Sequence, residues 1–161
     1  MVPTFVEIAE KKMVGKKLMT SMKENRIFEL WSGFMPLQRL IKGRIDNNLY
    51  SIEIYPNNYF AKLDPEATFE KWACVEVSDF TEIPESLESM SVPMGKYAVF
   101  KYKGHPHKAA ASFGYIFEEW LPASGYELDA RPHMEVMGSN YKNDSDDSEE
   151  EFWIPVSAKN M

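Results

Sequence analysis

One succession of patterns occurs twice along the chain and constrains its fold more than any other feature. In each half, a segment with strand-like alternation is followed by a helix-like segment and then by two further strand-like segments. The two halves match at a nearly constant spacing. The matching segments are Phe34–Pro36 with Trp120–Pro122, Ile52–Tyr55 with Met134–Met137, and Trp72 with Trp153. A repeated unit of this kind predicts an internal duplication.

The repeat predicts an α+β fold of two tandem βαββ repeats, related by pseudo-twofold symmetry and forming a ligand groove between them. We expect one domain over residues 1–161, with the first repeat at about 4–80 and the second at about 94–157. Residues 81–93 contain prolines, serines and glutamates and are expected to form the linker between the repeats.

The spacing of apolar residues predicts the individual elements. Ile27, Leu30 and Phe34 recur at helical intervals, which predicts a helix over residues 24–42 that Pro36 kinks or divides. A second helix is expected between Pro106 and Pro122. The expected strands are Phe5–Ala9, Met13–Met19 with a bulge or turn at Gly15, Leu49–Tyr55, Lys71–Phe80, Gly95–Lys103, Pro132–Gly138 and Glu151–Val156.

Alternation along these strands divides their side chains between two faces of a sheet. We expect one apolar set to pack under the helices: Ile52, Ile54, Val75, Val77, Phe100, Met134, Val136, Phe152, Ile154 and Val156. The opposite set contains Glu53, Tyr55, Trp72, Tyr97, Glu135, Met137 and Trp153. Aromatic and methionine side chains beside two carboxylates are unusual for a solvated face, so this set predicts an interface or a ligand groove.

Glu135 is the residue on which the functional interpretation depends. It lies in the middle of the expected strand 132–138, between Met134 and Val136. A carboxylate there faces solvent, or it is desolvated in a pocket, which costs several kcal/mol unless a cation meets it. Glu53 is the matching residue of the first repeat, and its sequence context fits a second anionic wall and a solvated strand residue equally well.

Composition excludes several classes of protein. The net charge of −7 disfavours a nucleic-acid surface, and no apolar run approaches the length of a membrane span. Cys74 is the single cysteine, so an intrachain disulfide is excluded and neither a metal cluster nor a cofactor is expected. The N-terminus lacks the pattern of a signal peptide, which predicts a cytoplasmic protein. The acidic run 144–151 lacks the glycine of a calcium loop and is expected to be solvated.

Four segments together resemble the GyrI-like, or AraC-type effector-binding, small-molecule-binding domain. They are Met94–Gly104, Glu119–Tyr126, Met134–Val136 and Phe152–Val156, whereas the N-terminal half is similar only in its pattern. The resemblance implies a bacterial domain of two βαββ repeats with a groove between them. Members of that family serve as effector-binding domains of multidrug-responsive transcription regulators, as gyrase-inhibitor-like proteins and as hydrolases of cyclopropane-bearing toxins.

The resemblance also implies roles for individual residues. Glu135 matches the strand glutamate that faces the cationic centre of bound drugs, and Trp153 matches an aromatic residue that lines the pocket. We therefore expect a hydrophobic, cationic small molecule as ligand. The expected ligand-binding residues are Glu135, Trp153, Tyr55, Tyr97, Trp31, Phe34, Met137 and Glu53.

Two alternatives remain open from the sequence. A hydrolase would use Glu135 as acid or base, with Tyr97 or Tyr55 protonating the departing group. A gyrase-inhibitor-like module would instead contact a protein partner, either gyrase or a regulator. No DNA-binding motif precedes the strand pattern that begins at Thr4, so we expect a stand-alone module without direct contact to nucleic acid.

Overall fold

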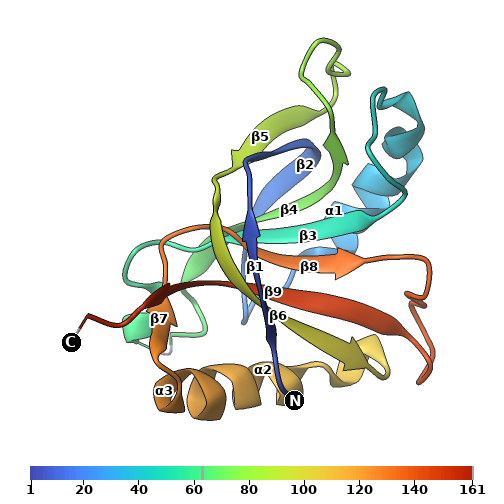
Figure 1. Cartoon of the computed structure of the whole chain (residues 1–161). Helices are drawn as coiled ribbons and strands as arrows, with labels where there is room; N and C mark the ends of the chain where they lie inside the picture. The colour runs from blue at the N-terminus through green and yellow to red at the C-terminus, as the bar shows by residue number, and fades with distance from the viewer. Residues whose placement is uncertain (63, 161) are drawn as a thin grey trace.

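The computed structural model of the protein describes residues 1–62 and 64–160 and contains a large sheet with helical segments on one face (Figure 1). The strands are β1 (Thr4–Ile8), β2 (Lys11–Ser21), β3 (Leu49–Ile54), β4 (Thr68–Val77), β5 (Glu88–Val92), β6 (Gly95–Lys103), β7 (Tyr126–Leu128), β8 (His133–Met137) and β9 (Glu149–Ala158). The helical segments are α1 (Ile27–Phe34), η1 (Met35–Leu40), η2 (Tyr59–Ala61), η3 (Pro106–Lys108), α2 (Ala110–Tyr115), η4 (Ile116–Trp120) and α3 (Leu121–Ala123). No helix in the described ranges is long and apolar enough to cross a membrane.

The strands follow the order β1-β6-β9-β8-β3-β4-β2-β5, with β7 paired to β9, and neighbouring strands run antiparallel. The pair β3 and β8 therefore lies in the middle of the sheet. Their register brings Ser51 opposite Glu135 and Glu53 opposite His133. On one side of this pair follow β4, β2 and β5, and on the other side β9, β6 and β1, so the N-terminal strand β1 lies at the edge of the half that is otherwise formed by C-terminal strands.

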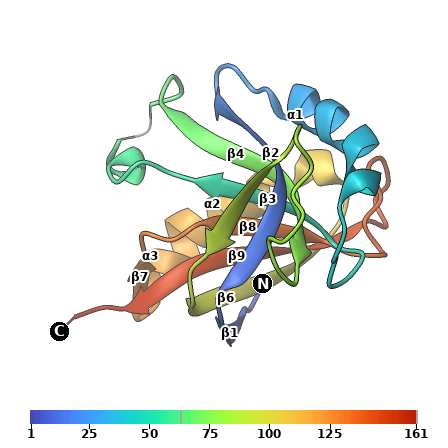
Figure 2. The same cartoon turned by 90° about the horizontal axis from the view of Figure 1, so that it is seen from above.

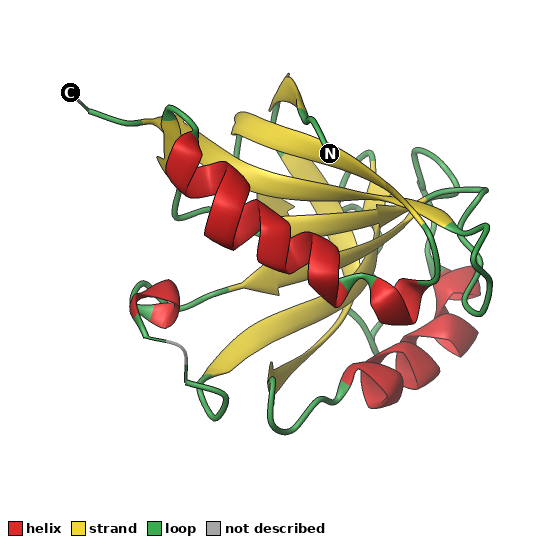
Figure 3. Cartoon of the chain, turned by 90° about the horizontal axis from the view of Figure 1, so that it is seen from below, coloured by secondary structure: helices red, strands yellow, loops and turns green. Residues whose placement is uncertain are grey.

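Both main helical segments cover the same face of the sheet and leave its middle strands between them (Figure 3). Leu30 and Phe34 of α1 pack on Val14 of β2 and on Ala73 and Val75 of β4. The segment α2–η4–α3 covers β6 and β9 through a second cluster. That cluster includes Ala98, Phe100, Ile116, Phe152, Ile154 and Val156. The predicted change at Pro36 is confirmed, because the α-helix passes into the tighter η1 at this proline.

The opposite face of the sheet encloses a separate core. The sheet curves strongly, so that the edge strands β1 and β5 approach each other on this side (Figure 2). Val6 of β1, Val92 of β5 and Met13 of β2 all join one apolar cluster with Ile52 and Met134 of the central strands. This face is therefore filled by the protein's own side chains.

The predicted assignment of faces is wrong for the central strands. Ile52, Met134 and Val136 pack in the core on the side away from the helices, whereas Val75 and Phe152 lie under the helices as expected. Two smaller expectations also differ from the structure. Gly15 lies within the unbroken strand β2 opposite Cys74, and the expected linker 81–93 contains the strand β5.

Candidate functional site

The candidate site lies on the helix face of the central strands β3 and β8. Alternation from the registered pair Ser51 and Glu135 brings Glu53, His133 and Met137 to the same face. The apolar clusters under α1 and α2 flank this surface, but its polar residues belong to neither cluster. The middle of the helix face is thus the place where the sheet presents ionisable groups among apolar walls.

Glu53 and Glu135 form the centre of the site. Glu53 is only 5% exposed, and burial together with the charge of the neighbouring Glu135 carboxylate raises the pKa of Glu53 well above its usual value, although the charge of Lys71 opposes this shift. Glu53 Oε1 accepts a hydrogen bond from Lys71 Nζ at 3.4 Å. Glu53 Oε2 and Ser51 Oγ are buried, and within the described part of the chain neither has a hydrogen-bond partner. Unpartnered buried polar atoms of this kind are rare in proteins, so each of them needs an explanation.

A third carboxylate, Glu150 of β9, completes the cluster. It is 7% exposed and lies on the same face as Phe152, the register partner of Glu135. Burial and the charge of Glu135 raise the pKa of Glu150 to about 7, although Lys71 opposes this shift. The sequence interpretation missed Glu150 because it assigned residues 144–151 to a solvated loop. The alternation of Glu150 with Phe152 and Ile154 was the signal that could have found it.

Lys71 of β4 brings a positive charge into the same cluster. Burial lowers its pKa, but the charges of Glu53 and Glu135 raise it by more, so the ammonium group stays charged at neutral pH. In the described ranges, no group of three or more His, Cys, Asp or Glu side chains is arranged to hold a metal ion. The cluster thus holds one ammonium group among the carboxyl groups of Glu53, Glu135 and Glu150.

Aromatic side chains border one end of the central strands. Tyr55 packs edge-on against His133, with 4.8 Å between the ring centres. Phe60 of η2 stacks on both His133 and Phe117, with ring centres 5.6 Å and 5.3 Å apart. Burial lowers the pKa of His133 to about 3, so its imidazole is neutral at pH 7 and behaves as another flat wall. A cavity of about 210 Å³ opens here, lined by residues that include Tyr55, Phe60 and His133.

A larger and more polar cavity of about 380 Å³ lies at the other end of the central strands. It is lined by Asn48, Lys101, Tyr102, Lys103, Val136, Gly138, Ser139, Asn140, Glu149, Glu150 and Glu151. The carboxylate cluster therefore lies between an aromatic cavity and a polar one.

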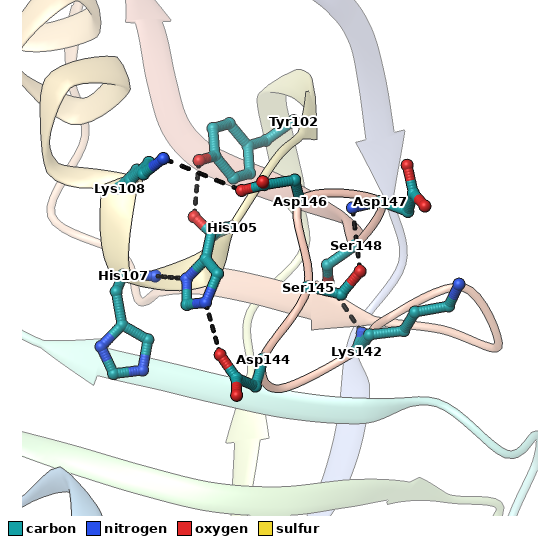
Figure 4. A network of polar contacts seen from close by, with 10 residues as sticks. All are labelled: Tyr102, His105, His107, Lys108, Lys142, Asp144, Ser145, Asp146, Asp147 and Ser148. Carbon is teal, nitrogen blue, oxygen red and sulfur yellow. Dashed lines mark hydrogen bonds and ion pairs between the residues drawn. The ribbon is translucent and has the colours of Figure 1, made fainter.

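The acidic loop beside the polar cavity is held to the start of the α2 segment (Figure 4). Asp144 Oδ1 lies 2.8 Å from His105 Nε2, and Asp146 Oδ1 lies 3.8 Å from Lys108 Nζ. Ser148 is buried, and its hydroxyl accepts a 2.7 Å hydrogen bond from the backbone N–H of Lys142. The aspartates are exposed as expected, but the loop ends at Ser148, and β9 begins at Glu149, two residues before the expected start.

The structure brings together four of the expected ligand-binding residues: Glu53, Tyr55, Glu135 and Met137. The two expected residues of α1 lie to one side. Phe34 is fully buried in the apolar cluster under α1, and Trp31 is half-buried with its ring packed edge-on against Phe34 at 5.9 Å. Phe34 is thus a core residue, which is the usual role of an aromatic residue at helical spacing.

Tyr97 and Trp153 lie on the other face of the sheet, so the prediction that they share a surface with Glu135 is wrong. Tyr97 is fully buried, and its hydroxyl donates a 2.7 Å hydrogen bond to the carbonyl oxygen of Pro132. Trp153 is opposite Met134 in the register, and its indole N–H donates to Glu151 Oε1 at 3.1 Å. The hydrolase alternative therefore keeps Glu135 but loses Tyr97 as its proton donor.

The fold and the site define a class of protein: an α+β domain whose sheet carries two helical segments on one face, with buried carboxylates between them. The sequence model of the GyrI-like small molecule binding domain matches residues 1–157. The chain belongs to the GyrI-like small molecule binding domain family.

Individual relatives agree with this membership. The transcriptional regulator BrlR of Pseudomonas aeruginosa is 29% identical over 146 residues, which cover 89% of this chain and 51% of the regulator. The chain therefore spans about half the length of that curated relative.

Solved structures share the fold at low sequence identity. SAV2435, solved bound to tetraphenylphosphonium, aligns with a TM-score of 0.72 at 17% identity, over 98% of this chain and 94% of that one. EcmrR, solved in a complex with DNA, aligns with a TM-score of 0.70 at 16% identity, over 98% of this chain and 57% of that one. A hydrolase encoded by lin2189 of Listeria innocua aligns less closely, with a TM-score of 0.62 at 11% identity, over 97% of this chain and 92% of that one. At these identities the similarity concerns the fold.

Proposed function

We propose that the protein is a receptor for hydrophobic, cationic small molecules, which bind on the helix face of β3 and β8. The observation that carries this proposal is the buried carboxylate cluster, in which Glu53 Oε2 has no partner in the described ranges and Glu135 remains partly exposed. A lipophilic cation supplies the charge that this cluster needs and removes its own apolar area from water.

The surroundings of the carboxylates support the same ligand class. Aromatic rings bind organic cations with about 0.5–2 kcal/mol per contact, depending on how dry the site is. Tyr55 and Phe60 offer such rings beside the carboxylates, His133 adds a neutral flat wall, and the adjoining cavity gives a ligand room to enter. The complex of SAV2435 with tetraphenylphosphonium, a lipophilic cation, makes this compound the first ligand to test on the present chain.

We also infer that the domain consists of two tandem βαββ repeats related by a pseudo-twofold axis between β3 and β8, with the ligand groove on this axis. The order β2, α1, β3, β4 recurs as β6, α2, β8, β9, which supports the duplication. Glu53 and Glu135 then come from matching positions of the two repeats. BrlR and EcmrR support a setting in transcription regulation inside the bacterial cytoplasm.

The test is a calorimetric titration with tetraphenylphosphonium and with neutral triphenylphosphine oxide. Glu135→Gln keeps the shape of the side chain but removes its charge, so we expect it to weaken phosphonium binding at least fivefold, or about 1 kcal/mol. Glu127→Gln, on the exposed part of β7, is the matched control and should bind as the parent does. Equal binding of the charged and neutral compounds, unaffected by Glu135→Gln, would contradict a cation receptor.

A hydrolase remains the second candidate, because Glu150 and Glu135 are neighbouring carboxyl groups and the pKa of Glu150 is raised to about 7. Carboxyl groups with separated pKa values can divide the roles of acid and base. Incubation with a cyclopropane-bearing electrophile, followed by mass spectrometry of the products, distinguishes turnover from retention. A protein partner captured equally well by the parent and by Glu135→Gln would instead favour the interaction role.

A further inference from the structure

We infer that Lys71 determines which ligand charge the site binds. Its ammonium group is a fixed positive charge within the site, and it makes the site bind ligands with one positive charge more tightly than ligands with two. The inference rests on the proposed function, since it concerns the same surface. It assigns to a residue of β4 the selection between monocations and dications.

The geometry of Lys71 makes it part of the site. Its ammonium nitrogen lies 3.4 Å from Glu53 Oε1, and only 10% of the Lys71 side chain and 7% of the Glu53 side chain are exposed. Three carboxylates from three different strands act on it: Glu53 of β3, Glu135 of β8 and Glu150 of β9. The ammonium group therefore faces the surface that a ligand would occupy.

The position of Lys71 is not one that the core requires. The next residues of β4 on the same face, Ala73, Val75 and Val77, are apolar and pack under α1. A buried ion pair contributes little stability compared with well-packed apolar residues, because both charges must leave water. A lysine that interrupts this apolar row is thus explained by the ligand surface better than by packing.

The charges of the cluster then set the ligand charge. Lys71 pairs with Glu53, and Glu150 is uncharged below its pKa of about 7, so at pH 6 the partly exposed Glu135 is the carboxylate that meets the ligand. A monocation finds its counter-charge there. A second positive charge on the ligand would lie close to the Lys71 ammonium in a site of low dielectric, where like charges repel strongly.

The test removes the charge and keeps the shape. Lys71→Met retains an unbranched apolar side chain, and Lys71→Gln retains a hydrogen-bond donor toward Glu53. Both are titrated at pH 6 with tetraphenylphosphonium as monocation, methyl viologen as aromatic dication and triphenylphosphine oxide as neutral compound. We expect phosphonium binding to strengthen by about fivefold, viologen binding by more than tenfold, and neutral binding by less than twofold.

Two controls separate charge from structure. Lys17→Met removes a lysine from the other face of the sheet, where Lys17 Nζ lies 5.6 Å from the centre of the Trp72 ring, and it should change none of the three affinities. Lys71→Arg keeps the charge and should keep the preference for the monocation. Near-ultraviolet circular dichroism of every variant establishes whether the fold is retained. If only one of Lys71→Met and Lys71→Gln folds, that variant alone is enough for the test.

Each outcome decides between the proposals. Binding of phosphonium by the parent, with no gain in Lys71→Met or Lys71→Gln, would overturn the role of Lys71 and leave the cation receptor intact. An equal gain in affinity for the neutral compound would also overturn the role of Lys71, because the substitution would then act by enlarging the site and not by removing a charge. Absence of cation binding in the parent and in all variants would overturn both proposals, whereas binding that appears only after removal of the charge would support the role of Lys71.

Discussion

The Tyr97 hydroxyl donates a 2.7 Å hydrogen bond to the carbonyl oxygen of Pro132, which joins the interior of β6 to the residue that precedes β8. Tyr97 is fully buried, and burial raises the pKa of its hydroxyl to about 12, so the group is a neutral donor at any physiological pH. Tyr97→Phe should lower the free energy of unfolding by about 1–2 kcal/mol, because it leaves a buried carbonyl oxygen without its donor. Urea denaturation measures this loss.

The same variant separates stability from binding. Tyr97 lies on the face opposite Glu135, so Tyr97→Phe should leave phosphonium affinity within about twofold of the parent. Tyr115→Phe is the matched control, since its hydroxyl makes a longer bond of 3.4 Å to Met1 O at the surface. A stable Tyr97→Phe protein that has lost phosphonium binding would contradict the separation of the two faces.

Gly15 is expected to be the least replaceable glycine of the sheet. It lies opposite Cys74 in the register of β2 and β4, and an added Cβ would overlap the carbonyl oxygen of Ala73 and come within 2.6 Å of the Cys74 Cα atom. Backbone atoms cannot move aside as a flexible side chain does. Gly15→Ala should therefore destabilise the protein by about 1–3 kcal/mol or prevent folding, as overpacking in a core does.

Gly114 of α2 provides the opposite case. A Cβ added there would meet no atom within 4 Å, and alanine favours a helix over glycine by about 0.5–1 kcal/mol. Thermal denaturation should show Gly114→Ala to be more stable than the parent and Gly15→Ala to be less stable. A Gly15→Ala protein with unchanged stability would mean that β2 and β4 are further apart than the structure has them.

The succession of strands and helices could be predicted because it depends on local periodicity. Ile27, Leu30 and Phe34 determine the stripe of α1 by their spacing alone, and Pro36 marks its end in the sequence. The four residues Tyr50, Ser51, Ile52 and Glu53 of β3 are a different case, because all of them are buried. A strand covered on both faces has no solvated side, so its alternation cannot tell which residues meet the helices.

This limit explains what was missed in the site. Glu53 and Glu135 could be identified from the sequence as ionisable residues in strands. Their neighbours, however, depend on the face of the sheet to which each side chain points. Lys71 and Glu150 lie near sequence segments that predict a strand end and a solvated loop, and only the pairing of β3, β4, β8 and β9 brings them together. Contacts of this kind join residues that are far apart in the chain, so local sequence patterns cannot predict them.

The aromatic end of the site gives a prediction for Phe60. Its ring stacks on Phe117 at 5.3 Å and on His133 at 5.6 Å, although 43% of the residue is exposed. Phe60→Ala should weaken binding of an aromatic cation by about 1 kcal/mol, or about fivefold, and should change stability less than a core substitution does. Trp153→Phe, on the opposite face, is the comparison and should bind normally. The reverse ranking in a calorimetric titration would restore Trp153 as the pocket residue.

Glu150 should make cation binding depend on pH. Because its pKa is raised to about 7, Glu150 is uncharged below that pH and adds a negative charge above it, beside Glu135 and the opposing ammonium of Lys71. Phosphonium affinity should therefore rise between pH 6 and pH 8 by about threefold to tenfold, since part of the new charge is screened by solvent. Glu150→Gln should flatten this rise and should match the parent at pH 6. Titrations at both pH values measure the effect, with triphenylphosphine oxide as the uncharged reference. A rise that persists in Glu150→Gln would assign the titration to Glu53, whose pKa burial also raises.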